Sequence, residues 1–520
     1  MTPYIPLFVI GGYLIGLLIL GLVSNMFFRG TSGDYFVASR SIGPFMLLMS
    51  VFGTTMTAFA LVGSTGKAYT TGIGVYGLMA SWSGLIHSAC FFLVGIKLWA
   101  IGKRYGYTTQ CQFFRDRFES PALGYMLFPV LVALIIPYLL IGLLGAGAVV
   151  RGLTIKMFPH VFASTNGAIP PWLTGLVVCG VVLTYVFVGG VRSTAWANTF
   201  QTLVFMLTGV IAFFMIAKAL GGPSAATRIV GEHSDKHSLL MRNGHIGRWQ
   251  FFTYLFVPLS VGMFPHLFQH WLTARSAKTF RLTVIFHPIC IMIVWVPCIL
   301  IGVWAAGKGL VPPPGANQNA ILGVAVKRLV ASPWLAGLLT AGILAAIMSS
   351  LDSQFMCVGS MFTNDIAIRL CGSQSLSDRQ KLNLARGFVV FVVVVTYLIS
   401  LVTTKHIFDL AVWCFSGYAA LFPIVLAAVY WKRATGSAVI AAVSVTVVVW
   451  AFLFKQSGYG GEYLLFSHWF DETDGIMPVA VIIMACFLTL VVVSWMTSPP
   501  SAQTVSKFFP DFKKEQATKQ

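Results

Sequence analysis

Charged residues are scarce in this chain. Asp, Glu, Lys and Arg make up 9% of its 520 residues, whereas 57% are hydrophobic. A soluble protein of this length could not hide so much apolar surface from water, so the composition excludes that class. Apolar runs of about 20 residues, long enough to cross the hydrocarbon core of a bilayer, recur from end to end. We therefore predict an all-α polytopic protein embedded in the lipid bilayer by about 13 transmembrane helices.

Acidic residues are the scarcer charged type. The chain has 15 Asp and Glu against 34 Lys and Arg, which gives a net charge of +19. In a soluble protein this balance would suggest a nucleic-acid partner. Here most Lys and Arg fall on one side of the predicted spans, as expected if the N-terminus lies outside and the C-terminus is cytoplasmic. We therefore expect no nucleic acid and predict a plasma-membrane protein, in the inner membrane if the source is bacterial.

Several other patterns are missing. The first apolar run follows MTPYIP without a charged segment or a cleavage site, so it is interpreted as a retained helix. The nine cysteines fall in predicted spans or inward loops and imply no disulfide framework. There is no H-E-x-x-H, no G-x-S-x-G and no clustered metal ligands. We expect a protein that is not an enzyme, without transition metal, cofactor or obligate protein partner.

A polar cluster interrupts the apolar run at residues 340–366, TAGILAAIMSSLDSQFMCVGSMFTNDI. Ser349, Asp352 and Ser353 share one helix face at i, i+3 and i+4, and Ser350 lies beside them. A polar group without a partner at this depth is costly, so the cluster needs an occupant or internal partners. Its oxygen atoms are the ligands that a small hard cation prefers.

Two predicted spans contain helix breakers. The span at about residues 43–68 is rich in Gly and Thr, and the span at about 249–273 has Pro258 and Pro265 on either side of Ser260. Unwound backbone at membrane depth is tolerated where it lines a cavity or the protein interior. The two spans lie five apart, so the chain is expected to contain two halves of inverted topology.

Several segments resemble the sodium:solute symporter family, whose members include symporters for galactose, proline, pantothenate and monocarboxylates. The resemblance covers roughly residues 34–433. The segments that carry it are DYFVASRSIG (34–43), YVFVGGVRSTAWANTFQ (185–201), FPHLFQHWLTARSAK (264–278), AAIMSSLDSQFMCVGSMFTNDI (345–366) and IFDLAVWCFSGYAALFPIVLAAVYWKR (407–433).

The resemblance implies a LeuT-type fold with a 5+5 inverted-repeat core. The units expected on this basis are an additional N-terminal transmembrane helix (1–30), a first repeat (41–220), a second repeat (249–431), two C-terminal transmembrane helices (434–498) and a cytoplasmic tail (499–520).

The resemblance also implies a sodium site between the first and eighth core helices. Its ligands would be the carbonyls of Gly53, Met56 and Ala346 and the hydroxyls of Ser349 and Ser350. All five groups are neutral, which favours Na⁺ over H⁺ as the coupling ion. The alternative is that the serines bond back to carbonyls one turn earlier in their own helix.

The match to the family's second sodium site is less direct. Members with a second sodium site place Asp on core helix five, where this chain has Asn198, and serines opposite, where this chain has Asp352 and Ser353. We hypothesise that Asn198, Ser349, Asp352 and Ser353 form a second cation site with its charge relocated. The alternative is that Asp352 simply hydrogen-bonds Asn198 or pairs with an arginine.

The solute is the least determined feature. Positions that line the sugar site of galactose symporters fall on Ala60, Met79, Trp82, Ser260 and Trp413, so most polar sugar contacts are missing. The Pro265-His266 pair resembles a motif of acetate, monocarboxylate and pantothenate symporters, although those members commonly have Arg where this chain has His270.

These residues favour a small carboxylate such as a monocarboxylate or a pantothenate-like anion, with amino acids as the next alternative. Hydroxyls of Thr54, Thr55 and Thr57, broken-helix N-termini or the sodium ion would meet the anion. The expected function is sodium-coupled symport by alternating access. A transporter-like membrane sensor acting with a separate signalling partner is the other class considered.

Overall fold

The computed structural model describes residues 4–24, 36, 40–242, 245–371, 376–469 and 474–509. Within these ranges the chain is helical, and β-structure is limited to two isolated bridges. Eleven helices are long and apolar enough to cross a membrane, or 13 if two bent helix pairs each count as one span. The prediction of an all-α polytopic protein with about 13 spans is confirmed.

The helices of the first part of the chain are α1 (Ile5–Ser24), α3 (Pro44–Thr55), η4 (Phe59–Gly63), α4 (Ser64–Thr71), η5 (Gly77–Ser81), α5 (Trp82–Cys90), η6 (Phe91–Gly95), α6 (Ile96–Tyr105), α7 (Gln110–Arg117), α8 (Pro121–Thr154), η7 (Ala163–Thr165), α9 (Pro171–Ala219), α10 (Pro223–Glu232) and η8 (His237–Leu240). Those that follow are α11 (Arg248–Thr253), η9 (Tyr254–Gly262), α12 (Pro265–Thr273), η10 (Ala277–Thr279), α13 (Phe280–Gly307), η11 (Gln318–Ala320), α14 (Ile321–Leu329), α15 (Pro333–Met361), η12 (Phe362–Ala367), α16 (Ile368–Cys371), α17 (Asp378–Val402), α18 (Ile407–Ala420), α19 (Phe422–Tyr430), α20 (Gly436–Gln456), η13 (Ser467–Trp469), α21 (Pro478–Met496) and α22 (Ala502–Phe508).

Local sequence explains where several of these helices begin and bend. Ser120 and Ser332 each precede a proline and accept a hydrogen bond from the backbone N–H three residues on, which caps α8 and α15. The element α9 contains two membrane spans that follow each other without a loop. Gly190, at the junction between them, takes φ 60° and ψ −155°. That conformation is open mainly to glycine.

Both spans with predicted breakers are bent. α3 and the η4–α4 segment meet at 57°, and the α11–η9 segment meets α12 at 51°. The ends of the two bent spans are joined: Ile42 N–H donates to the Thr273 carbonyl at 3.0 Å, and Arg275 N–H donates to the Ile42 carbonyl at 3.0 Å. The two broken spans therefore share one anchored end.

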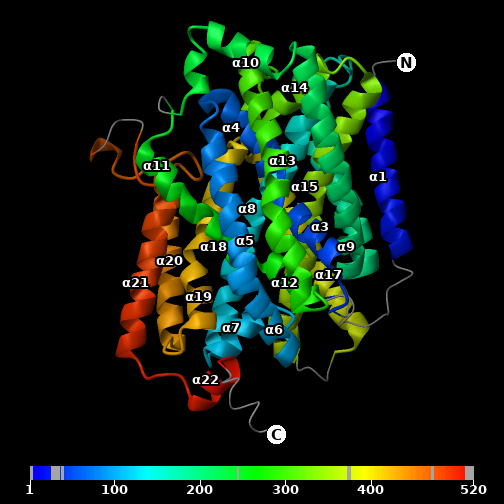
Figure 1. The fold of residues 1–520 in the computed structure, drawn as a ribbon. Coiled ribbons are helices and arrows are strands. Elements are labelled where there is room, and N and C mark those ends of the chain that lie inside the picture. Colours follow the sequence, from blue (N-terminus) through cyan, green and yellow to red (C-terminus); the bar gives the residue numbers. More distant parts are fainter. Residues whose placement is uncertain are drawn as a thin grey trace.

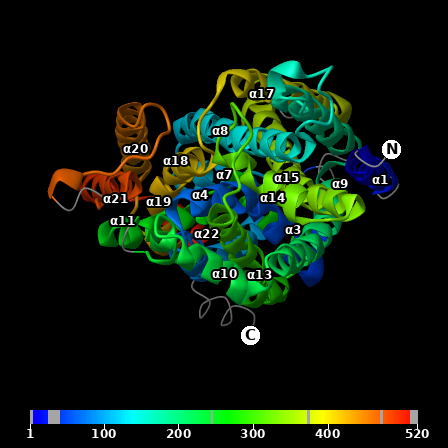
Figure 2. The same ribbon diagram turned by 90° about the horizontal axis from the view of Figure 1, so that it is seen from above.

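Of the eleven unbroken spans, those that contain α15 and α18 are the most enclosed, and α1 is the most peripheral. Seen from above, α20 and α21 form a pair at one edge of the bundle, with α1 at the opposite edge (Figure 2). α10 and α14 lie at the end of the bundle where α1 begins, and α22 lies at the other end beneath α6 and α7 (Figure 1). The predicted unit boundaries stay predictions, and parts of the 1–30 and 499–520 units lie outside the described residues.

Candidate functional site

The first component of the site is the break after α3. Met56 and Thr57 are outside helical geometry, and both are buried. One turn earlier, α3 approaches α9 so closely that a Cβ atom on Gly53 would lie 2.2 Å from Thr202 Oγ1. Glycine at this position therefore permits the contact that holds the end of α3 against α9.

The second component is α15, which brings Ser349 to this break. Ser349 Oγ lies 2.8 Å from the Gly53 carbonyl oxygen and 2.9 Å from the Ala346 carbonyl oxygen, within hydrogen-bond distance of both. Ser349 and Ala346 are fully buried. A hydroxyl and two carbonyls from two helices thus converge at the centre of the bundle, and this is the donor set that a small hard cation prefers.

Ser350 and Met56 complete the predicted set, and both are buried. Ser350 Oγ donates to the Ile347 carbonyl at 2.9 Å, so its hydroxyl bonds back to its own helix. The Met56 N–H donates to the carbonyls of Phe52 and Gly53 at 3.0 and 3.2 Å. The structure therefore brings Ser349, Gly53 and Ala346 into contact and places Met56 at the break, whereas the Ser350 hydroxyl is turned towards α15 itself.

The predicted second cluster is also assembled. Asp352 is fully buried, and its carboxylate lies 2.9 Å from Tyr185 Oη and 3.1 Å from Ser353 Oγ. The Asn198 amide fits when its nitrogen faces Asp352, because the opposite orientation would set two oxygens against each other. Its nitrogen is then 3.0 Å from both carboxylate oxygens, and its oxygen accepts from Ser353 Oγ at 2.9 Å. Because the single Ser353 proton goes to the Asn198 oxygen, two neutral donors face the carboxylate, the Tyr185 hydroxyl and the Asn198 amide.

His270 belongs to this polar network. Its Nε2 lies 3.0 Å from Ser353 Oγ and its Nδ1 lies 3.0 Å from Ser50 Oγ, with all three side chains buried. The imidazole thus connects α12 to α15 and α3. It lies beside the cluster around Asp352, so this chain has an imidazole at the position where related symporters commonly have arginine.

A central cavity of about 30 Å³ lies beside the α3 break. Among the described residues that line it, six are aromatic and none is Asp, Glu, Lys or Arg. The aromatic residues are Phe59, Tyr138, Tyr254, Phe264, Trp295 and Phe415, and the hydroxyl-bearing ones besides the two tyrosines are Thr55, Ser83 and Ser260. Two of the predicted solute contacts, Thr55 and Ser260, therefore border one cavity.

The three threonines differ in their hydrogen bonds. Thr55 Oγ1 donates to the Phe52 carbonyl at 2.8 Å, and Thr57 Oγ1 accepts from the Phe59 N–H at 3.0 Å. Thr54 Oγ1 is buried and has no partner among the described residues. Thr54 is therefore the threonine whose hydroxyl is available to a ligand.

Four other predicted solute contacts, His266, Ala60, Met79 and Trp82, are not among the described residues that line the central cavity. His266 is fully buried and packs against Tyr138 and Phe264, and neither ring nitrogen has a partner among the described residues. Ala60 and Met79 are fully buried. Trp82 directs its indole N–H to the Phe251 carbonyl at 3.2 Å.

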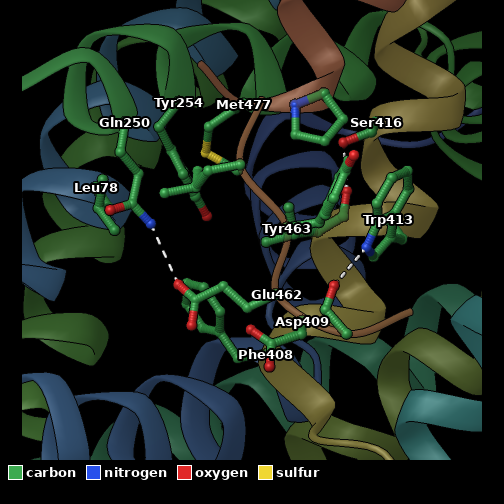
Figure 3. Close-up of a pocket in the computed structure, with 14 residues that line it drawn as sticks. Leu78, Gln250, Tyr254, Phe408, Asp409, Trp413, Ser416, Glu462, Tyr463 and Met477 are labelled. Carbon is green, nitrogen blue, oxygen red and sulfur yellow. Dashed lines mark hydrogen bonds between the residues drawn. The ribbon is translucent and has the colours of Figure 1, made fainter. Parts of the chain in front are cut away.

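Trp413 borders a second cavity, nearer the end of the bundle that carries α10. Its indole N–H donates to the Gly461 carbonyl at 2.8 Å (Figure 3). This outer cavity, of about 30 Å³, is also lined by Asp409, Glu462 and Tyr254. Tyr254 borders both cavities.

An ion network that sequence reasoning missed lies next to the outer cavity. Lys67 Nζ is 2.6 Å from Glu462 Oε2 and 3.8 Å from Asp409 Oδ1. Gln250 Nε2 donates to Glu462 Oε1 at 3.2 Å (Figure 3). The signal available in the sequence was Lys67 itself, a lysine at the end of an apolar span, but its partners are hundreds of residues away.

A buried histidine pair was also missed. His87, which lines the central cavity, has its Nδ1 3.1 Å from His287 Nε2, and both rings lie in membrane spans. The sequence showed His87 as one histidine in an apolar run, for which packing is the commoner role. Its partner could not be identified from local pattern.

Comparison with known proteins identifies one family and relatives whose names agree with it. The sequence profile of the sodium:solute symporter family matches residues 35–445. The sodium/proline symporter of Salmonella typhimurium is 25% identical, with 92% of each chain covered, and that of Escherichia coli is 24% identical, with 92% of this chain and 93% of the relative covered. The sodium/pantothenate symporter of Escherichia coli is 26% identical over 81% of this chain and 84% of that protein.

Solved structures show the same fold. A Na⁺-coupled sialic acid symporter, in a substrate-bound outward-open state, superposes with a TM-score of 0.74 at 20% identity and covers 96% of this chain and 100% of its own. Mhp1, a nucleobase-cation-symport-1 family transporter, gives a TM-score of 0.53 at 14% identity, with 91% and 97% covered. The expected LeuT-type fold is confirmed.

Proposed function

The chain belongs to the sodium:solute symporter family, and from that premise we propose that it carries a small organic solute bearing a carboxylate across the membrane together with Na⁺. The relatives are named for proline and pantothenate, and both compounds carry a carboxylate. A small carboxylate such as a monocarboxylate or pantothenate-like anion is the first choice, and an amino acid is the alternative.

The observation that carries this proposal is the convergence of Ser349, Gly53 and Ala346. These groups join a straight helix of the second half of the chain to the break in the first half. A cation bound there holds the two halves together, so its binding favours one arrangement of the bundle over another. Differential affinity of this kind is what coupling between ion and solute requires. The carbonyl of Met56 and the hydroxyl of Ser350 complete the proposed sodium site.

We propose the cluster of Asn198, Ser349, Asp352 and Ser353 as a second cation site. Ion binding requires the Asn198 amide to turn, so that its oxygen and the carboxylate face the ion together. In the state without the ion, the amide nitrogen faces the carboxylate in the place that the ion would occupy. The carboxylate is supported by neutral donors alone, and a cation adds the countercharge that a buried carboxylate otherwise lacks.

The solute is placed in the central cavity. Its volume of about 30 Å³ is close to that of one water molecule, so the cavity has to widen when the solute binds. Its aromatic lining, without Asp, Glu, Lys or Arg among the described lining residues, suits a compact solute. Thr54 and His266 offer unpartnered polar atoms close to the α3 break and the aromatic wall. The carboxylate is met there by hydroxyls and by the neighbouring sodium ion, since no lysine or arginine lines the described cavity.

Contacts at the two ends of the bundle support alternating access as the mechanism. At the end of the bundle near α22, the two broken spans are joined through Ile42 and Thr273. At the other end, Lys67 pairs with Asp409 and Glu462, two carboxylates that line the outer cavity. Transport requires each set of contacts to release in turn. We place the α22 end in the cytoplasm, in agreement with the positive-inside rule.

Uptake into proteoliposomes tests the function. Labelled proline, pantothenate, acetate and glucose are offered under an inward sodium gradient, and we expect accumulation of at least one carboxylate and no glucose. Ser349→Ala should abolish the sodium dependence, whereas Ser444→Ala, on a lipid-facing part of α20, should leave it intact. A sensor would bind its ligand without accumulating it, and the absence of sodium-driven accumulation for every carboxylate would refute the proposal.

A further inference from the structure

A basic groove lies at the α22 end of the bundle, apart from both cavities. It has a volume of about 560 Å³ and lies between α6, α19 and α22. Its lining includes Lys97, Arg104, Lys432 and Lys507, together with apolar residues and the aromatic ring of Phe508. None of the described residues that line it is acidic. The chemistry of the groove is therefore that of an anion site with an apolar border.

Lys97 is the residue that places this groove at the membrane. It lies inside the predicted span Gly77–Tyr105, and its side chain is exposed on the outer surface of the bundle. Arg104 is seven residues further on, on the same helix face and about 10 Å nearer the end of the span. Phe92 and Leu93, one turn in the other direction, are 60% and 46% exposed. The helix thus presents an apolar surface that ends in two cations.

Lys97 and Lys432 have no carboxylate partner in the part of the chain that the structure describes. Lys97 Nζ lies 3.5 Å from the centroid of the Tyr430 ring, a cation–π contact that leaves the charge in place. A lysine at this depth is costly unless an anion meets it or its end reaches the interface.

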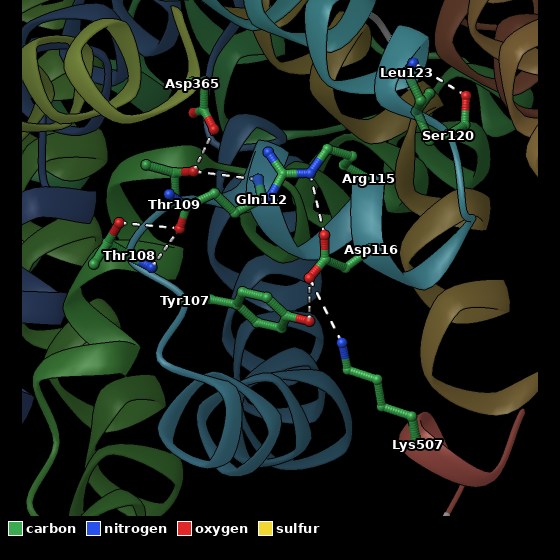
Figure 4. A network of polar contacts seen from close by, with 10 residues as sticks. All are labelled: Tyr107, Thr108, Thr109, Gln112, Arg115, Asp116, Ser120, Leu123, Asp365 and Lys507. Atoms are coloured by element: carbon green, nitrogen blue, oxygen red, sulfur yellow. Dashed lines mark hydrogen bonds and ion pairs between the residues drawn. The ribbon is translucent and has the colours of Figure 1, made fainter. Parts of the chain in front are cut away.

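Lys507 differs from the other basic residues of the groove. Its Nζ lies 3.6 Å from Asp116 Oδ2, and Asp116 also accepts from Arg115 Nε at 3.1 Å and from Tyr107 Oη at 3.0 Å (Figure 4). Its charge is therefore shared with a carboxylate. The positive charge that no described carboxylate shares is therefore that of Lys97, on α6, and of Lys432, just beyond the end of α19.

The floor of the groove, α22, is fixed in position. Tyr105 Oη donates to the Lys507 carbonyl at 2.8 Å, and Phe508 packs on Tyr105. At the other end of α22, hydrogen bonds from Ser501 and Thr504 hold the pKa of Glu119 below its usual range. The groove is therefore a depression whose floor, α22, is fixed by these contacts.

We propose that this groove binds the phosphate of an anionic phospholipid from the leaflet that borders α22. The acyl chains lie along Phe92, Leu93 and Tyr430, and the phosphate contacts Lys97, Arg104 and Lys432. A lipid fits better than a soluble anion because the apolar surface and the cations are continuous on the membrane-facing side of α6. The bound lipid bridges α6 in the first half of the chain and α19 in the second.

This inference does not depend on which solute is carried. It predicts that the protein in phosphatidylglycerol nanodiscs melts at a higher temperature than in phosphatidylcholine nanodiscs, because bound lipid stabilises the folded state. Lys97→Gln/Lys432→Gln should remove that difference. In native mass spectrometry, the double variant should bind phosphatidylglycerol about 30-fold more weakly, since each basic residue near an anionic surface contributes roughly a factor of five.

The matched control is Arg369→Gln/Arg379→Gln, which removes the same charge from α16 and α17 at the same end of the bundle. It should keep the difference between the two lipids, and Lys97→Arg should also keep it. Equal loss in the control and the Lys97→Gln/Lys432→Gln variant would refute the site, because net charge alone would explain the effect. If inorganic phosphate in detergent reproduces the stabilisation in full, the groove takes a free anion and the lipid proposal fails.

Discussion

Asp352→Asn is the most informative single substitution, because it separates a second cation site from a hydrogen-bonded carboxyl group. The side chain keeps its size and buried position, but it loses its charge and one acceptor oxygen. Asp352 is fully buried, and Tyr185, Ser353 and Asn198 surround it. The consequences for sodium binding differ sharply between the two interpretations.

If a cation binds against the carboxylate, the substitution removes one partner of a buried charge pair, which is worth about 3–5 kcal/mol. Sodium affinity at that site should then fall by roughly two to three and a half orders of magnitude. If the carboxyl group only accepts hydrogen bonds, the loss is limited to about 1 kcal/mol for each bond. The number of bound ions would then be unchanged.

Equilibrium binding of ²²Na⁺ to the purified protein counts the ions without knowledge of the solute. We expect two ions per chain in the native protein and one in Asp352→Asn. Asp409→Asn is the control, because it makes the same charge change in the outer network and should leave two ions bound. One ion in the native protein, unchanged in Asp352→Asn, would refute the second site.

Three further substitutions test the geometry. Gly53→Ala should lower the melting temperature, because the added Cβ would lie 2.2 Å from Thr202 Oγ1. The expected overpacking cost is about 1–3 kcal/mol. Thr202→Ala should restore stability in the double variant, and its failure to do so would contradict the contact. Glu462→Gln should weaken the pair with Lys67, so that hydrogen exchange across residues 457–464 rises; unchanged exchange would argue against an outer closure. Gly190→Ala should destabilise the protein by about 1–3 kcal/mol in thermal unfolding, since its φ of 60° and ψ of −155° favour glycine; an unchanged melting temperature would refute this strain.

The broken spans could be predicted from sequence because their causes are local. Pro258 and Pro265 interrupt hydrogen bonding within their own turn, and the Gly- and Thr-rich run around Gly53 weakens the other helix. The clustering of Ser349 and Asp352 on one face followed from helical periodicity alone. These elements needed no knowledge of what packs against them.

The side-chain partners could not be predicted, because they depend on long-range packing. Lys67 meets Glu462 from a loop near the end of the chain, and nothing near either residue in the sequence indicates the pair. The Ser350 hydroxyl turns to its own helix, a choice of rotamer that residue identity does not determine. Trp413 was grouped with the central solute contacts by resemblance, and the structure places it at the outer cavity.

Tyr254 has a kinetic consequence for the transport cycle. Among the described lining residues, Tyr254 on η9 is the one that the two cavities share, so we expect its ring to separate them. Reorientation of one ring is much faster than the collective helix motions of a bundle, which take microseconds to milliseconds. We therefore expect capture of the solute from the outer cavity to be a rapid pre-equilibrium, and turnover to be governed by the slower release of Ile42 from Thr273 at the opposite end.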